Sequence, residues 1–302
     1  MSKFWKGLGI SLICIAILTV SYLIYEQIGG LLQYKKSVLG LASNYIGLQQ
    51  QYEDYKTQTK NLRQLNILAE KDSKTNQIAN IINSYAAKVE GDLSIYYKNL
   101  ANNESIILDG DRKYYMASLY KVFLTIFILD EIKKGKITWD TKIGTTSATL
   151  ETGLNKIIIE SNNEYAQMLA EGYGWKIIEG EMKKKLGIDF NFNENLEINV
   201  KNVGLLFENI ALSLKVTGDQ SSYLLNLLKN QKNILKLPKY LPANIYAHNK
   251  TGEFEDYSHD AGIFYTPKAN YILVFMSKTK LPGETNEQMA LMSKAIYESL
   301  NH

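Results

Sequence analysis

The chain has 302 residues, 45% of them hydrophobic and 22% charged, which is enough apolar material to build a folded core. The formal net charge of +3 argues against a nucleic-acid-binding protein, because such proteins usually carry a strong basic excess. The single cysteine excludes disulfides within the chain and a zinc site built from several thiolates, and we expect no metal site.

Residues 7–25 form an uncharged run rich in leucine, isoleucine and valine. This run is long enough for a membrane-spanning helix, and Lys3 and Lys6 before it favour a cytoplasmic N-terminus. Cleavage as a signal peptide, or lipid attachment at Cys14, is less well supported because polar or bulky residues stand where small ones are required. The sequence therefore predicts a cytoplasmic stub and transmembrane anchor over residues 1–26, a cell-membrane location, and an extracytoplasmic C-terminal part.

The segment 27–74 differs in composition from both of its neighbours. It is rich in glutamine, lysine, asparagine and tyrosine, lacks proline, and places Leu62, Leu65 and Leu68 at roughly helical spacing. This pattern fits a helical stalk and fits a disordered linker nearly as well, so both alternatives stay open. The heptads are too irregular to indicate a coiled coil.

Residues 75–302 show the pattern of a packed domain. Two strand-like segments, Asp92–Lys98 and Ser105–Leu108, flank a turn-prone Ala-Asn-Asn sequence and predict a β-hairpin. A long helix is expected over Ser118–Lys134, with further helical segments up to about residue 232. Three strands and an amphipathic helix then close the chain, over 245–250, 262–265, 271–277 and 283–300. Strands at both ends of the domain predict an α+β fold, in which one antiparallel sheet carries an inserted all-helical subdomain.

Three short motifs within this domain suggest chemistry. Ser118 and Lys121 are three residues apart, so their side chains are neighbours on one face of a helix. A lysine amine and the positive end of a helix both activate a serine hydroxyl as a nucleophile. The other two motifs are Ser161-Asn162-Asn163, before a helical run, and Lys250-Thr251-Gly252, at the end of a predicted strand.

Each motif alone has an ordinary structural explanation, but their order and context are specific. Together they resemble the set of the penicillin-recognising serine enzymes, and most closely the class A β-lactamases, which carry S-x-x-K, S-D-N and K-T-G. The resemblance covers residues 75–302 and implies the fold of that family, with no metal or organic cofactor. Asn162 departs from the pattern, because the family usually has aspartate there.

The resemblance implies four catalytic residues. Ser118 corresponds to the nucleophile that becomes acylated, and Lys121 to its general base or electrostatic partner. Ser161 corresponds to the residue that relays a proton to the lactam nitrogen. Lys250 is expected to supply positive potential near Ser161.

The resemblance also implies substrate-binding residues. Thr251, together with Lys250, is expected to hold the substrate carboxylate, with Gly252 allowing close approach to the strand. Asn163 is expected to bind the side-chain amide of the substrate, and the backbone N–H groups of Ser118 and Glu253 to form the oxyanion hole. Both arginines of the chain precede Ser118, so we expect recognition of the carboxylate to depend mainly on the third motif.

Class A enzymes hydrolyse the acyl-enzyme with a glutamate on a long loop between the second and third motifs. The corresponding loop is shorter here, and its only nearby carboxylates are Glu194 and Glu197. Both are candidates for the deacylation base, although solvated surface glutamates are the more ordinary explanation. Without a positioned base, a β-lactam would acylate Ser118 and stay attached.

The sequence therefore predicts a membrane-anchored extracytoplasmic serine hydrolase that forms an acyl-enzyme with β-lactams and deacylates weakly. One alternative is a D,D-carboxypeptidase or penicillin-binding protein that acts on a D-Ala-D-Ala-like peptide of peptidoglycan. Another is a non-catalytic module that presents the fold to a partner in the cell envelope. The intact serines and lysines of all three motifs argue against this last alternative.

Overall fold

The computed structural model describes the backbone of residues 2–69, 74–192 and 194–301, and the side chains of residues 16–54, 56, 74–192 and 194–301. By its internal contacts the chain divides into two compact units, Met1–Lys71 and Asp72–His302.

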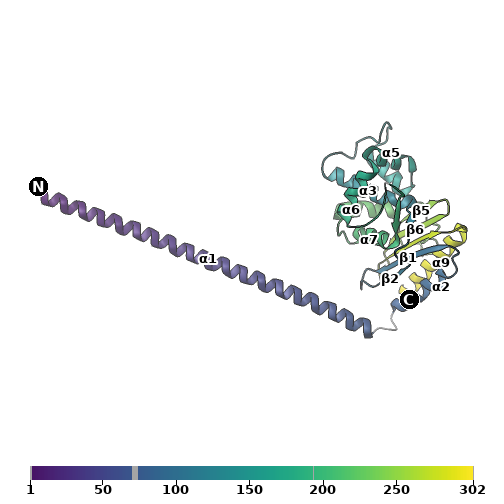
Figure 1. Cartoon of the computed structure of the whole chain (residues 1–302), viewed down its shortest axis with the longest axis horizontal. Coiled ribbons are helices and arrows are strands. Elements are labelled where there is room, and N and C mark those ends of the chain that lie inside the picture. Colours follow the sequence, from purple (N-terminus) through teal and green to yellow (C-terminus); the bar gives the residue numbers. More distant parts are fainter. Residues whose placement is uncertain (1, 70–73, 193, 302) are drawn as a thin grey trace. The chain divides into compact units, whose positions relative to one another are not determined.

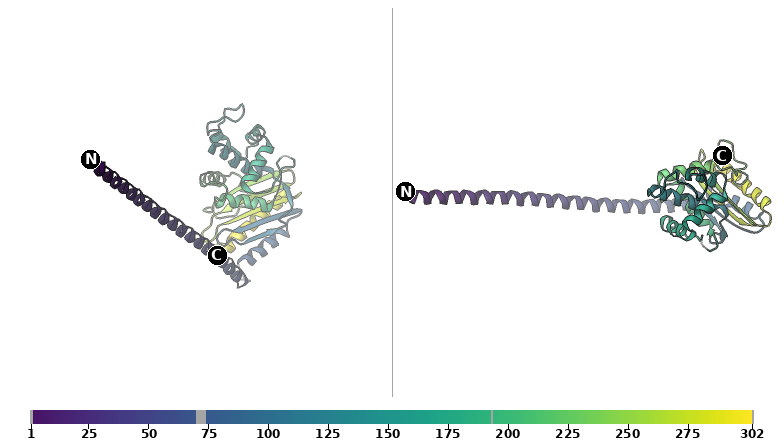
Figure 2. Two further views of the ribbon diagram at one scale, coloured as in Figure 1. Left: turned by 60° about the vertical axis from the view of Figure 1, so that its left-hand side comes forward. Right: turned by 90° about the horizontal axis from the view of Figure 1, so that it is seen from above.

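The first unit contains a single helix, α1 (Ser2–Ala69), which runs without interruption (Figure 1, Figure 2). It includes most of the segment for which the sequence left a helical stalk and a disordered linker open. Within the described part of the chain, no helix combines the length and the apolar character that crossing a membrane requires. The side chains of residues 7–15, which make up half of the predicted span, lie outside the described residues, so the anchor stays a prediction.

The second unit contains a five-stranded antiparallel sheet in the order β2-β1-β7-β6-β5. The strands come from both ends of the domain, as the sequence predicted. The hairpin is formed by β1 (Asp92–Asn99) and β2 (Ser105–Leu108), and the later strands are β5 (Ala247–Phe254), β6 (Tyr257–Phe264) and β7 (Tyr271–Lys278). The predicted α+β fold is therefore confirmed.

Two layers of helices cover the two faces of this sheet (Figure 1). On one face, α2 (Lys74–Ala86) packs beside α9 (Pro282–Asn301) over a core that includes Ile82 and Met292. On the other, α7 (Val200–Ala211) contacts β1, β6 and β7. The inserted helices beyond it are α3 (Tyr120–Lys133), α4 (Leu150–Ile159), α5 (Asn163–Tyr173), α6 (Trp175–Leu186) and α8 (Gly218–Lys229).

Helix α3 is the centre of the helical layer. It is apolar on nearly every side, and its side chains from Lys121 to Leu129 are all buried. A helix of this kind is stable only when other elements surround it, and α4, α5, α6 and α8 all contact it. The first turn of α3 is therefore held rigidly, and this turn carries Lys121.

Several strands differ from the sequence expectation, and β6 begins at Tyr257 rather than at residue 262. A small second sheet pairs β3 (Lys113–Tyr115) with β4 (Glu197–Asn199), two strands too short to give an alternating pattern. The third motif lies inside β5 rather than at its end, because β5 continues past the motif and pairs with β6 as far as Phe254. The polar residues of the motif interrupt the apolar pattern, and the predicted strand was therefore too short.

Candidate active site

Ser118 lies in a 3-10 turn, η1 (Ala117–Leu119), which leads directly into α3. The sequence analysis expected the α-helix to begin at Ser118, but α3 begins two residues later, at Tyr120. Ala117 has a φ of 46°, a conformation that is strained for a residue with a side chain. Strand β5 passes close to this turn, because a Cβ on Gly252 would lie 3.0 Å from the carbonyl oxygen of Met116. Glycine therefore lets the third motif approach the backbone of the nucleophile.

Lys121 connects the first and second motifs through hydrogen bonds of its amine. Its Nζ donates hydrogen bonds to the Oγ of Ser118 at 2.9 Å, the carbonyl oxygen of Ser161 at 2.6 Å and the Oδ1 of Asn163 at 2.6 Å. The side chain is fully buried, and burial lowers the pKa of its ammonium to about 8. Roughly a tenth of the amine is therefore neutral at pH 7, and this form can act as a general base for Ser118.

Ser161 joins the second motif to the other two. Its Oγ accepts hydrogen bonds from Lys121 at 3.1 Å and from Lys250 at 2.9 Å. Because a hydroxyl has two acceptor sites and one hydrogen, these bonds leave its O–H free to donate to a substrate. Its φ of 57° turns the backbone so that its carbonyl oxygen also faces Lys121.

Lys250 is buried in β5, where its Nζ also donates to the carbonyl oxygen of Thr251 at 3.0 Å. Burial, followed by the positive charge of Lys121, lowers the pKa of Lys250 to about 7. A substrate carboxylate beside this amine would favour its charged form.

The two asparagines of the second motif have different surroundings. The side chain of Asn162 caps the N-terminus of α5 by accepting a hydrogen bond from the backbone N–H of Tyr165 at 2.8 Å. The departure from aspartate therefore lies at a local capping position. The Oδ1 of Asn163 is occupied by Lys121, so its amide nitrogen is the group that remains to donate to a substrate carbonyl.

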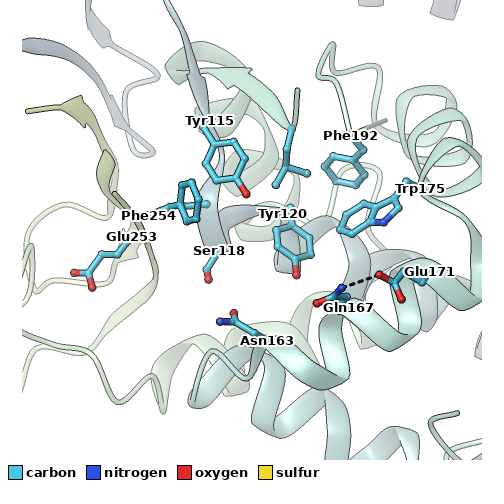
Figure 3. Close-up of a pocket in the computed structure, with 12 residues that line it drawn as sticks. Tyr115, Ser118, Tyr120, Asn163, Gln167, Glu171, Trp175, Phe192, Glu253 and Phe254 are labelled. Atoms are coloured by element: carbon cyan, nitrogen blue, oxygen red, sulfur yellow. Dashed lines mark hydrogen bonds between the residues drawn. The ribbon is translucent and has the colours of Figure 1, made fainter. Parts of the chain in front are cut away.

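Ser118 lies between two hollows, and one of them, the aromatic cavity, has five aromatic side chains in its walls (Figure 3). This larger cavity of about 510 Å³ is lined by Tyr115, Ala117, Ser118, Tyr120, Asn163, Gln167, Glu171, Trp175, Phe192, Leu196, Glu253 and Phe254. The other hollow, about 460 Å³, is more polar and is lined by Ser118, Ile159, Glu160, Ser161, Asn163, Gln231, Lys232, Asn233, Thr251 and Glu253. A substrate at Ser118 can therefore extend in two directions with different chemistry.

The structure does not bring Glu194 or Glu197 to the nucleophile. Glu194 is exposed and lies beside Asn191, while Glu197 pairs with Tyr115 in the small sheet. Neither residue lines either hollow, whereas Leu196 between them does.

Lys236 is a buried cation near the site that the sequence analysis missed. Its Nζ donates to the Oγ of Ser258 at 2.8 Å and to the carbonyl oxygen of His259 at 3.1 Å. It also pairs with the carboxylate of Glu253 at 2.9 Å, and burial lowers its pKa. Its sequence neighbours give no clear signal of burial, because Leu237 is buried but Leu235 is exposed.

His259 has a structural role next to the nucleophile. It is fully buried, and burial lowers its pKa to about 4, so the ring is neutral at pH 7. The backbone N–H of Ser277 donates to its Nδ1, so its Nε2 carries the hydrogen and donates to the carbonyl oxygen of Tyr115 at 2.8 Å. This hydrogen bond links β6 to β3, the strand that precedes Ser118.

Within the described residues, no group of three or more histidine, cysteine, aspartate or glutamate side chains is arranged to hold a metal ion. The groups that meet at Ser118 are instead hydroxyls, amines and amides. Their arrangement favours nucleophilic chemistry by a serine.

The fold and this arrangement together define a β-lactamase-like serine enzyme. A model of the beta-lactamase enzyme family matches residues 74–300, and the chain belongs to this family. A comparison with curated proteins found no match.

Solved structures show the same fold at low sequence identity. A beta-lactamase from Chitinophaga pinensis has a TM-score of 0.68 and 21% identity, and the match covers 74% of this chain and 100% of that one. The TLA-1 extended-spectrum beta-lactamase has a TM-score of 0.68 and 16% identity, with 76% and 100% covered. PBP-A has a TM-score of 0.66 and 17% identity, with 74% and 96% covered.

Proposed function

We propose that this protein is a membrane-anchored, extracytoplasmic serine hydrolase that forms an acyl-enzyme with β-lactams and releases it slowly. One observation carries the proposal: the amine of Lys121, whose pKa burial lowers to about 8, lies 2.9 Å from the hydroxyl of Ser118. An amine in this position takes up the proton of the hydroxyl as the oxygen attacks a carbonyl carbon.

Acylation then follows from the groups around Ser118. The neutral Lys121 amine accepts the Ser118 proton, and the Oγ forms a bond to the lactam carbonyl carbon. The backbone N–H groups of Ser118 and Glu253 stabilise the oxyanion. When the carbon–nitrogen bond breaks, Ser161 gives its proton to the nitrogen and recovers one from Lys121, which returns to its neutral form. The substrate carboxylate lies toward Lys250 and Thr251.

Slow deacylation follows from the surroundings of the cavity. Hydrolysis of the ester requires a base that activates water beside the acyl carbon. The carboxylates that line the aromatic cavity are Glu171, two helical turns from Asn163, and Glu253, which pairs with Lys236. Phe192 and Leu196 are apolar and supply no base.

The acylation step is tested with a fluorescent penicillin followed by denaturing electrophoresis. We expect the intact protein to be labelled covalently and Ser118→Ala to lose all labelling. Ser84→Ala removes an exposed hydroxyl of α2 and is expected to be labelled like the wild type. An unlabelled wild-type protein would rule out acylation and favour the non-catalytic envelope module.

A D,D-carboxypeptidase or penicillin-binding protein is the second candidate function. Among the described residues, the carboxylates that line the aromatic cavity are either two helical turns from Asn163 or paired with Lys236. This favours the second function, because a site without a positioned base retains a β-lactam. A variant of PBP-A has been solved as an acyl-enzyme complex with penicillin G. With the chromogenic cephalosporin nitrocefin, a burst of one equivalent favours this second function, and sustained turnover favours a β-lactamase. Release of D-alanine from a D-Ala-D-Ala peptide would support it directly.

Attachment to the cell membrane is the remaining part of the proposal. The uncharged run over residues 7–25, preceded by two lysines, supports it. We expect the full chain to stay with membranes after an alkaline wash and a chain lacking residues 1–26 to be released. Release of the full chain by the same wash would contradict the anchor.

A further inference from the structure

Helix α5 carries a row of polar side chains along the aromatic cavity. Asn163, Gln167 and Glu171 are four residues apart, so they share one face of α5, and all three line the cavity (Figure 3). Asn163 lies at the nucleophile, since Lys121 bonds both Asn163 and Ser118. Eight residues of helix correspond to about 12 Å. The carboxylate of Glu171 therefore marks the far end of a long cavity.

The wall opposite the far half of this row is aromatic. The ring centroids of Tyr120 and Trp175 are 5.2 Å apart, and those of Trp175 and Phe192 are 5.9 Å apart. The three rings pack against one another, and Phe192 is buried. Such a wall suits an aryl or extended apolar group between the two ends of the cavity.

The far end of the cavity is negatively charged. The carboxylate of Glu171 accepts a hydrogen bond from the Nε2 of Gln167 at 2.7 Å, and this contact holds it on the cavity side of the helix. None of the described residues that line the cavity is a lysine or an arginine. Trp175 adds an indole face beside the carboxylate, and indole attracts cations more strongly than other aromatic rings do.

We propose that Glu171 and Trp175 form a subsite for a cationic group at the end of the acyl side chain of the substrate. The favoured acyl donors carry an ammonium about 12 Å from the reacting carbonyl, joined to it by an aryl or extended apolar segment. The inference rests on the proposed function, because the side chain enters the cavity as part of the group transferred to Ser118. It makes the substrate dipolar, with its carboxylate toward Lys250 and its ammonium toward Glu171.

Two matched penicillins test the subsite. One carries a 4-(aminomethyl)phenylacetyl side chain, and the other the neutral 4-(hydroxymethyl)phenylacetyl side chain of nearly the same shape. We expect the wild-type protein to be acylated roughly three- to tenfold faster by the amine, as for a partly exposed ion pair with a cation–π contact. Glu171→Gln keeps an acceptor for Gln167 and is expected to abolish the preference while both penicillins still react.

The control variant Glu164→Gln removes the same charge from the same helix at an exposed position that does not line the cavity. It is expected to keep the full preference. Equal acylation of the wild type by both penicillins, or an unchanged preference in Glu171→Gln, would overturn the subsite.

A binding measurement separates this inference from the proposed function. In Ser118→Ala, 4-methylbenzylamine is expected to shift the indole N–H resonance of Trp175, and Glu171→Gln is expected to remove the shift. If the amine binds in this way while no penicillin acylates the wild type, the subsite stands and the acylation proposal fails. If the amine leaves the resonance unchanged, the subsite is wrong, whatever the result of acylation.

Discussion

Two buried amines share one hydroxyl at the centre of the site. Lys121 and Lys250 both donate to the Oγ of Ser161, and burial lowers the pKa of each amine. Because the charge of Lys121 also lowers the pKa of Lys250, the state in which both amines are protonated is disfavoured. The active form has Lys121 neutral, to take the proton of Ser118, and Lys250 charged, to hold a carboxylate.

This requirement predicts a bell-shaped pH profile for acylation. The neutral fraction of Lys121 increases as the pH rises through about 8, and the charged fraction of Lys250 decreases above about 7. The acylation rate constant is therefore expected to peak between these values when it is measured by stopped-flow from about pH 5 to about pH 10. Lys250→Gln is expected to lose the falling limb. A flat profile in the wild type would contradict the assignment of the amines.

The capping position of Asn162 predicts the effect of restoring the residue usual in the family. Aspartate keeps the acceptor for the Tyr165 N–H and adds negative charge at the N-terminus of α5. Asn162→Asp is expected to raise the free energy of unfolding by about 0.3–1 kcal/mol. Asn162→Ala is expected to lower it by about 1 kcal/mol in urea unfolding followed by circular dichroism. An unchanged free energy of unfolding in Asn162→Ala would show that the cap contributes nothing.

At the scale of elements, the nucleophile is positioned by strands rather than by its own helix alone. The small β3–β4 sheet holds the segment before Ser118, and the backbone N–H of Met116 donates to the carbonyl oxygen of Leu196 at 2.7 Å. On the other side, β5 lies against η1 where Gly252 has no side chain. The strained turn at Ala117 is therefore fixed from both directions.

The close approach of β5 predicts a specific defect in Gly252→Ala. The added Cβ would lie 3.0 Å from the Met116 oxygen and 3.3 Å from the Ala117 Cβ, so the backbones must move apart. We expect the acylation rate constant to fall by roughly tenfold to a hundredfold, because small misplacements of reacting groups are costly. Stability is expected to fall by about 1–3 kcal/mol.

The matched control is Gly180→Ala in α6, where a Cβ would meet nothing within 4 Å. It is expected to stabilise the protein by about 0.5–1 kcal/mol and to leave acylation unchanged. Unchanged acylation in Gly252→Ala, measured by stopped-flow, would show that the close approach is not required.

At the scale of the whole molecule, the chain consists of a long helix and a compact catalytic unit. Helix α2 belongs to the catalytic unit, because Ile78 and Ile82 are fully buried in the core that α9 covers. The boundary of the folded domain therefore lies before α2.

This boundary predicts the outcome of truncation. A fragment of residues 72–302 is expected to unfold cooperatively and to react with penicillin as fast as the full chain. A fragment that begins at residue 90 lacks Ile78 and Ile82 and is expected to lose about 3–6 kcal/mol of stability from burial alone. That loss is comparable to the whole stability of many domains. A stable second fragment in urea unfolding would contradict the role of α2.

The sequence predicted the parts of the site that depend on local spacing. Ser118 and Lys121 are one turn apart, and the other two motifs are contiguous, so the type of residue at a fixed offset was sufficient. Glu171 lies eight residues after Asn163 on the same helix, but its sequence did not show that this helix face lines a cavity. Lys236 lies outside every motif, and only the packing of the chain brings it to Glu253 at the edge of the site. The segment that carries Glu194 and Glu197 lies between the second and third motifs, but its sequence did not show which side chains face Ser118.

Whether Ser118 forms a long-lived acyl-enzyme is measured by intact-protein mass spectrometry after the protein is mixed with benzylpenicillin. The expected result is an increase by the mass of one intact penicillin, located on the peptide that contains Ser118, which persists after excess penicillin is removed. An unmodified protein at every time point would contradict acylation. An adduct that forms on Ser118 and disappears within seconds, with penicillin hydrolysed in many equivalents, would contradict slow deacylation.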